Sequence, residues 1–261
     1  MKRFFTIVCT VVFLLSMSSF NAFASQSLDE QLIANGFPEA LVQEMLEEQK
    51  ESLVEQECVY VSTKVSDYDE EGNLISVKTF ENDITPYGQI KSSSLTLTII
   101  AALNYENNIV ITANYKWKVL PVNRWQDPIG IRWDDNVFKY KSGSFKKVDK
   151  CTAKINGKDT TLTFSNENRY ADMGYGYVTW YADLAGHGVS PTSLFGYGEF
   201  HLVRKEPNKK IPTQVFMHYV HAKLSTGLSL SYSGAGFSVS GGSSYDEAGT
   251  DLSFSSSGGR L

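Results

Sequence analysis

The sequence lacks an excess of basic residues. It contains 24 Lys and Arg residues against 29 Asp and Glu residues, which gives a net charge of −5. A nucleic-acid-binding domain carries a strongly basic face. We therefore exclude nucleic acid as a partner.

The sequence also lacks a second long apolar run and a recognisable catalytic motif. After residues 4–20, no segment reaches the roughly 20 apolar residues that a spanning helix needs. There is no nucleophile elbow and no His-Glu-x-x-His helix, and His218 and His221 would point to opposite faces of a strand. We expect no metal site, no cofactor and no catalytic residue. The sequence leaves open a catalytic site assembled from distant loops.

The N-terminus has the pattern of a secretory signal peptide. Lys2 and Arg3 precede the apolar stretch, and Ala22-Phe23-Ala24 supplies a small-x-small cleavage site. This pattern predicts cleavage after Ala24 and a secreted, extracellular product. Loss of Lys2 and Arg3 would change the net charge from −5 to −7.

Residues 25–57 predict an acidic helical hairpin. Ser27 and Glu30 have the spacing of a capping box, and Pro38 suits the first position of a second helix. The segment holds nine acidic residues and one base, Lys50. It is expected to dock on the rest of the chain, or to act as a pro-segment or a partner-binding arm.

Residues 58–254 predict one all-β domain, followed by a flexible Ser/Gly tail at 255–261. Apolar and polar residues alternate clearly in a hairpin over residues 90–119, which is typical of strands with one buried face. Further short strands follow with no long helix between them. We predict an antiparallel β-sandwich or open barrel of about a dozen strands.

Two cysteines, Cys58 and Cys151, follow the predicted signal peptide. In an exported protein an even pair suggests a disulfide. Two buried free thiols fit the sequence equally well, because separation along the chain says nothing about distance in space.

Two surface regions are candidates for ligand contact. One is a basic run that includes Lys146, Lys147 and Lys150, which would contact anionic wall polymer or lipid head groups, or would serve only as a solvated edge strand. The other is aromatic, and its rings would stack on glycans or lie in the core. Its members are Tyr175, Tyr177, Trp180 and Tyr197.

The 90–119 hairpin allows another function. Each strand exceeds the 9–11 residues of a membrane-spanning strand, with one apolar and one polar face. A secreted toxin or bacteriocin-like protein would use such a hairpin to enter a membrane. An ordinary sandwich hairpin shows the same alternation.

Several short motifs resemble those of a loose group of uncharacterised secreted proteins of Gram-positive bacteria. The motifs are Trp117-Lys118-Val119-Leu120-Pro121, Arg124, Asp127, Ile129-Gly130-Ile131 and Trp133-Asp134. The resemblance implies secretion and a β fold, and it supplies no catalytic residues. Together, these observations predict a secreted, non-enzymatic binding or surface-interaction protein, with membrane-active toxin as the alternative.

Overall fold

The computed structural model describes residues 26–69, 71–79, 94–185, 188–223, 227–234, 236–241 and 244–257. The predicted signal peptide and its cleavage site after Ala24 lie outside these residues, as does the beginning of the predicted 90–119 hairpin. The chain divides between Gln56 and Glu57 into two compact units.

In residues 26–56, the N-terminal unit has three short helices, α2 (Leu28–Ala34), α3 (Glu39–Val42) and α4 (Glu47–Glu55). The predicted capping box forms, since Glu30 N donates to Ser27 Oγ at 3.2 Å and Ser27 N donates to Glu30 Oε2 at 2.9 Å. The expected second helix is two helices, because Leu46 has an extended backbone (φ −72°, ψ 149°). Lys50 joins α4 to α2 through an ion pair with Asp29 at 2.7 Å.

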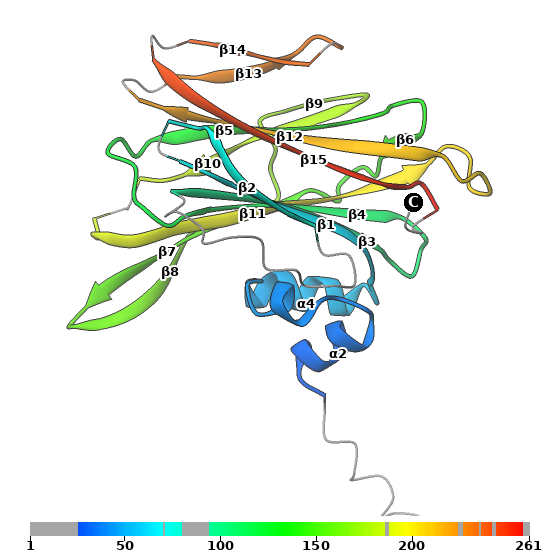
Figure 1. The fold of residues 1–261 in the computed structure, drawn as a ribbon, viewed down its shortest axis with the longest axis horizontal. Helices are drawn as coiled ribbons and strands as arrows, with labels where there is room; N and C mark the ends of the chain where they lie inside the picture. The colour runs from blue at the N-terminus through cyan, green and yellow to red at the C-terminus, as the bar shows by residue number, and fades with distance from the viewer. Residues whose placement is uncertain are drawn as a thin grey trace, which may run out of the picture. The chain divides into compact units, whose positions relative to one another are not determined.

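The C-terminal unit is an antiparallel β-sandwich, as the sequence predicts (Figure 1). The larger sheet has the order β2-β1-β3-β4-β11-β7-β8, and β6 also pairs with β11. Its strands are β1 (Val59–Tyr68), β2 (Leu74–Thr79), β3 (Leu95–Leu103), β4 (Ile109–Trp117), β6 (Phe138–Tyr140), β7 (Lys146–Ile155), β8 (Lys158–Glu167) and β11 (Pro191–Arg204).

The second sheet has the order β15-β12-β5-β10-β9, and a separate pair of strands, β13 and β14, forms a small third sheet. Among the described residues neither large sheet closes into a barrel. The strands are β5 (Gln126–Trp133), β9 (Asp172–Gly174), β10 (Tyr177–Asp183), β12 (Pro212–Ala222), β13 (Ser229–Tyr232), β14 (Phe237–Ser240) and β15 (Tyr245–Ser255). The β structure continues through Ser255, and Ser256 N donates to Ile211 O at 2.9 Å.

The inner faces of the two large sheets form one apolar core. Alternate residues of β3 and β4 face it, as the sequence pattern predicts, and those of β5 and β12 face it from the other sheet. Aromatic rings fill the space between the sheets, including Trp133 and Phe200 with centroids 5.4 Å apart. Burial of these faces supplies the main stabilisation of the sandwich.

A polar cluster crosses this core at Asp127, which is fully buried on β5. Its Oδ2 accepts hydrogen bonds from Tyr219 Oη at 2.6 Å and contacts His221 Nδ1 at 2.8 Å, and its Oδ1 accepts one from Ala222 N at 3.2 Å. Tyr219 Oη in turn accepts from Trp117 Nε1 at 2.9 Å. Since Trp117 lies on β4 and Tyr219 on β12, the cluster links the two sheets.

The two described cysteines are buried free thiols, so the alternative without a disulfide is the one observed. Cys151 lies on β7 and Cys58 directly precedes β1, and β3, β4 and β11 separate those two strands in the sheet. A disulfide needs Cα atoms within about 7 Å of each other. Burial raises the pKa of both thiols, and the carboxylate of Glu199 raises that of Cys58 further.

Replacement of Asp127 by Ala should lower the free energy of unfolding by about 3 kcal/mol, because it leaves the Tyr219 hydroxyl and other buried groups without their acceptor. Urea denaturation measures the change. Asp159→Ala, at an exposed carboxylate on β8, is the control. It should leave the free energy of unfolding within about 0.5 kcal/mol of wild type. Equal effects of the two substitutions would contradict the role given to Asp127.

Cys58 and Cys151 should both react with iodoacetamide when the protein is denatured without a reductant, and mass spectrometry counts the added groups. In the native protein both should react slowly at neutral pH, because burial raises the pKa of each thiol and shields it. Alkylation that requires prior reduction would reveal a disulfide and contradict the structure.

Candidate functional site

An open pocket lies where β5 and β12 part. The two strands pair from Tyr219↔Ile129 to Val215↔Trp133, and there their ladder ends. β12 continues towards Pro212 paired with β15, whereas the chain turns away from β12 after Trp133, with Val137 N donating to Asp134 O at 3.1 Å. This divergence leaves a notch at the end of the sheet.

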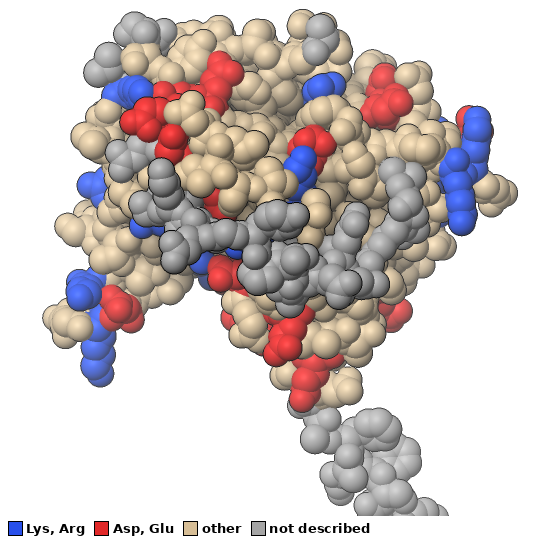
Figure 2. All heavy atoms as spheres, in the orientation of Figure 1, with Lys and Arg blue, Asp and Glu red and all other residues tan. Residues whose placement is uncertain are grey.

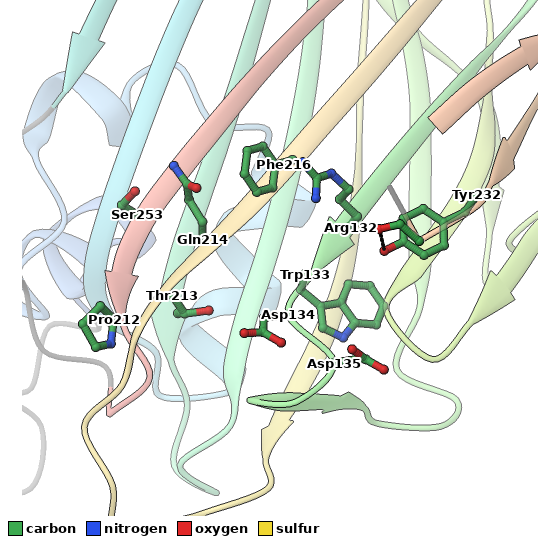
Figure 3. Close-up of a pocket in the computed structure, with 11 residues that line it drawn as sticks. Arg132, Trp133, Asp134, Asp135, Pro212, Thr213, Gln214, Phe216, Tyr232 and Ser253 are labelled. Atoms are coloured by element: carbon green, nitrogen blue, oxygen red, sulfur yellow. Dashed lines mark hydrogen bonds between the residues drawn. The ribbon is translucent and has the colours of Figure 1, made fainter. Parts of the chain in front are cut away.

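The notch has a volume of about 580 Å³, and we call it the Trp133 pocket (Figure 3). This size is within the range of about 300–1,000 Å³ that is common for small-molecule sites. Its lining residues come from β5 and the turn after it, from β12 and β15, and from the end of β13 and the β13–β14 connection. They are Arg132, Trp133, Asp134, Asp135, Pro212, Thr213, Gln214, Phe216, Tyr232, Gly234 and Ser253.

Two residues at the pocket, Trp133 and Thr213, have side chains with buried polar atoms. Trp133 is 4% exposed and Thr213 is 8% exposed. Within the described part of the chain, neither Trp133 Nε1 nor Thr213 Oγ1 has a hydrogen-bond partner. Both atoms are inaccessible to solvent, and Trp133 faces the core, where it packs on Phe200, so neither atom is open to the pocket.

Charged and aromatic groups form the walls of the pocket. The Arg132 guanidinium lies over the Phe216 ring, 3.7 Å from its centroid. Asp134 Oδ1 accepts hydrogen bonds from Asn136 N at 2.9 Å and from Asn136 Nδ2 at 3.0 Å, which fixes the turn after β5. Asp135 is also exposed. The pocket lining therefore contains one guanidinium group and two carboxylates.

The small β13–β14 sheet supplies one side of the pocket through Tyr232. The Tyr232 ring packs on Tyr177 of β10, with centroids 4.7 Å apart, and on Phe237 at 5.6 Å. Phe237 lies directly over Gly130 of β5, where an added Cβ would be 2.6 Å from the ring. A larger residue at position 130 would therefore push Phe237, and Tyr232 with it, away from β5.

The structure separates the four aromatic residues predicted to contact a ligand. Tyr175 is 91% exposed and Tyr177 is partly exposed, beside the pocket. Trp180 and Tyr197 lie in the interior at 1% and 2% exposure, so they form no part of an aromatic surface. The alternation of strand residues accounts for this result, because one face of β10 and part of β11 must be buried in a sandwich.

The predicted basic run does not form a continuous basic strip. Lys146 pairs with Glu199 at 3.1 Å, and Lys147 pairs with Asp149 at 3.0 Å and donates to the carbonyl oxygen of Tyr181 at 2.8 Å. Lys147 and Lys150 are buried.

The edge-strand interpretation of this run is wrong for its central lysines, because β7 lies between β11 and β8. On the face shown in Figure 2, the Lys and Arg atoms lie in separate groups among other residues.

The hairpin proposed for membrane entry lies inside the larger sheet. β3 pairs with β1 and β4, and β4 pairs with β3 and β11. Exposing this hairpin would break the ladders on both of its outer sides and uncover the apolar core. The described helices include none long and apolar enough to cross a membrane.

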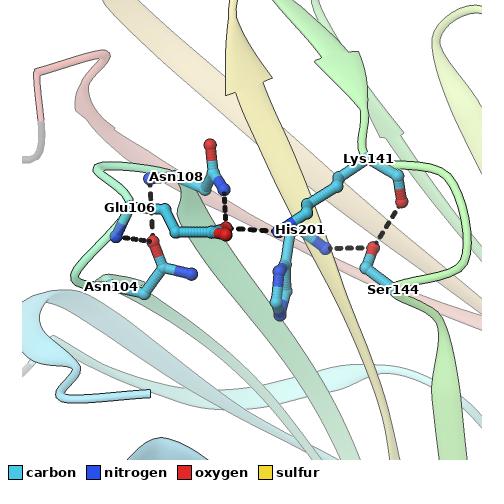
Figure 4. A network of polar contacts seen from close by, with 6 residues as sticks. All are labelled: Asn104, Glu106, Asn108, Lys141, Ser144 and His201. Carbon is cyan, nitrogen blue, oxygen red and sulfur yellow. Dashed lines mark hydrogen bonds and ion pairs between the residues drawn. The ribbon is translucent and has the colours of Figure 1, made fainter.

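A second polar cluster joins the β3–β4 turn to β6 and β11 (Figure 4). Glu106 pairs with Lys141 and accepts from Asn108 Nδ2 at 2.8 Å, and Ser144 Oγ accepts from His201 N at 3.0 Å. These contacts hold the loops together. Across the described residues, no group of three or more His, Cys, Asp or Glu side chains is arranged to bind a metal.

Sequence reasoning missed most of the pocket. From the sequence, Trp133-Asp134 is noted only among the motifs of the resemblance. A binding role was not inferred, because Trp133 and Thr213 have the positions of ordinary core residues. The available signal was the position of Trp133-Asp134-Asp135 where a strand ends.

Unfolding should become easier as the pH falls below about 6.5, in part because of His201. Burial lowers the pKa of His201 below its ordinary 6.5, opposed by Glu199 and Glu106 and assisted by Lys141 and Lys146. The unfolded chain therefore binds a proton at a higher pH than the folded protein does, and stability is lost as the pH falls. Urea midpoints at pH 7.5 and 5.5 should differ less for His201→Gln than for wild type. An unchanged difference would show that His201 does not contribute.

Comparison with known proteins gives only weak similarities. No family model matches the sequence, and no curated protein matches it. Among solved structures, the chain is similar to the C-terminal domain of the Streptococcus agalactiae AgI/II polypeptide BspA, with 12% identity and a TM-score of 0.31 over 61% of this chain and 57% of that one. It is also similar to the Corynebacterium diphtheriae major pilin SpaA, with 8% identity and a TM-score of 0.22 over 61% and 58%. The alignments thus span less than two thirds of either matched chain, and scores of this size establish neither a family nor an activity.

Proposed function

We propose that the protein is a secreted, non-enzymatic binding protein that contacts a ligand on a cell surface through the Trp133 pocket. The signal-peptide pattern of residues 1–24 supports secretion. The pocket supports binding, because rigid strands position its walls and its polar groups converge on one open space.

One observation carries the proposal. The Trp133 pocket is an open space of about 580 Å³ with ring faces and charged groups in its walls. The Arg132 guanidinium stacks on Phe216, and the turn after β5 adds two exposed carboxylates. The neighbouring carboxylates lie beside one another on a turn and suit hydrogen bonding to a ligand.

Purified walls of a Gram-positive bacterium are the first probe, in a co-sedimentation assay with the chain that begins at Ser25. Wild type should sediment with the walls. Ser253→Trp should not, because position 253 is an exposed lining position on the edge strand β15, and a bulky ring there fills the pocket without entering the core.

Thr161→Trp is the matched control, since Thr161 is also exposed and lies on β8, the edge strand of the other sheet. It should sediment like wild type. Equal binding by both variants would place the binding surface elsewhere. Failure of wild type to bind walls, with binding to phosphatidylglycerol vesicles instead, would overturn the proposal in favour of a membrane-active protein.

A further inference from the structure

The connection between β4 and β5 exposes three apolar side chains. It spans residues 118–125 and joins the larger sheet to the second sheet, and we call it the β4–β5 loop. Val122 is 95% exposed, Trp125 is 44% exposed and Val119 is 41% exposed. Single exposed apolar residues are common on soluble proteins, whereas a tryptophan and two valines within seven consecutive residues indicate a contact surface.

Hydrogen bonds and core packing hold the β4–β5 loop in place. Leu184 N donates to Trp125 O at 2.9 Å, and Asn123 Nδ2 donates to Lys223 O. Leu120 is partly buried and packs against the apolar core. The exposed side chains are therefore carried by a backbone that is already anchored, so that binding through them costs little conformational entropy.

The β4–β5 loop carries positive charge. It contains two bases, Lys118 and Arg124, and no acid. Arg124 is exposed and has no ion-pair partner within the described residues. Lys118 pairs with Asp67 at 3.3 Å, and its side chain is still 43% exposed. The loop thus presents apolar groups together with a guanidinium that can meet an anion.

This combination fits a lipid surface better than a protein or a wall polymer. A stable protein interface usually buries about 800 Å² on each partner, more than three side chains of one loop supply. An anionic polymer would contact the bases but leave Val122 in water. In a bilayer, tryptophan lies at the level of the head groups, smaller apolar side chains reach the acyl boundary, and basic residues attract anionic lipids.

We propose that the β4–β5 loop inserts Val122 and Trp125 into the interfacial region of an anionic phospholipid bilayer, where Arg124 contacts lipid phosphates. The protein would then rest on the membrane surface. Unlike entry of the predicted 90–119 hairpin, this contact breaks no ladder of the sandwich. It is also separate from the Trp133 pocket, whose lining includes no residue of the loop.

Trp125 reports directly on this contact. It is the exposed one of the four tryptophans, since the other three are at most 4% exposed. The chain that begins at Ser25 is mixed with vesicles of phosphatidylglycerol and phosphatidylcholine whose acyl chains carry bromine, which quenches nearby indole fluorescence. Wild type should lose fluorescence relative to the same vesicles without bromine. Vesicles of phosphatidylcholine alone should bind it about tenfold more weakly.

Val122→Asp should weaken vesicle binding at least about tenfold, because it removes apolar burial and brings a carboxylate to an anionic surface. Tyr105→Asp is the matched control. Tyr105 is 63% exposed in the β3–β4 turn, at the opposite end of β4 from the loop. This control should bind like wild type, and urea midpoints verify that both variants fold. Equal weakening by the two substitutions would overturn the role of the loop.

Two further outcomes would overturn the proposal. Bound vesicles that leave Trp125 unquenched would place the lipid contact elsewhere. Absence of vesicle binding, with a dimer that Val122→Asp dissociates in analytical ultracentrifugation, would assign the loop to protein contact. Ser253→Trp should bind vesicles like wild type and Val122→Asp should sediment with walls like wild type, so this proposal and the proposed function can fail separately.

Discussion

The position of β5 depends on the buried carboxylate of Asp127. Tyr219 and the backbone of Ala222 donate to it from β12, and through Tyr219 it is joined to Trp117 of the opposite sheet. These contacts hold the start of β5 beside the end of β12. Because side chains alternate along a strand, a slip of one residue would turn Trp133 outward and Arg132 inward. The register that places Trp133 at the pocket is thus supported about six residues away, at Asp127.

A second buried carboxylate, that of Asp149, explains why Lys147 of the predicted basic run does not form part of a basic surface. Tyr115 donates to Asp149 at 2.8 Å, and Lys147 pairs with it at 3.0 Å, while burial raises the pKa of the Asp149 carboxyl against the influence of both. The Tyr115 ring also packs on Tyr219, with centroids 5.9 Å apart, so the two buried carboxylate clusters adjoin. A lysine that compensates a buried carboxylate is not available to attract an anionic surface.

The sequence predicted the features that depend on local periodicity. The alternation in β3 and β4, the Ser27–Glu30 capping box and the all-β class all follow from the spacing of neighbouring residues. It could not decide between a disulfide and free thiols, since that depends on which strands separate Cys58 from Cys151. Likewise, the sequence could not separate exposed from buried aromatic residues, because the same strand β10 carries the partly exposed Tyr177 and the buried Trp180.

The pocket was hidden from the sequence for a different reason. Trp133 and Trp180 are both buried tryptophans whose N–H groups have no partner in the described chain, and both have the pattern of core residues. Trp180 packs its ring against Gly198, where an added Cβ would be 2.7 Å away, so close packing accounts for its position. Trp133 instead ends its strand where β12 diverges, and the pocket opens beside it. Whether a pocket opens beside a buried tryptophan therefore depends on where two strands separate, and that depends on pairing between segments far apart in the sequence.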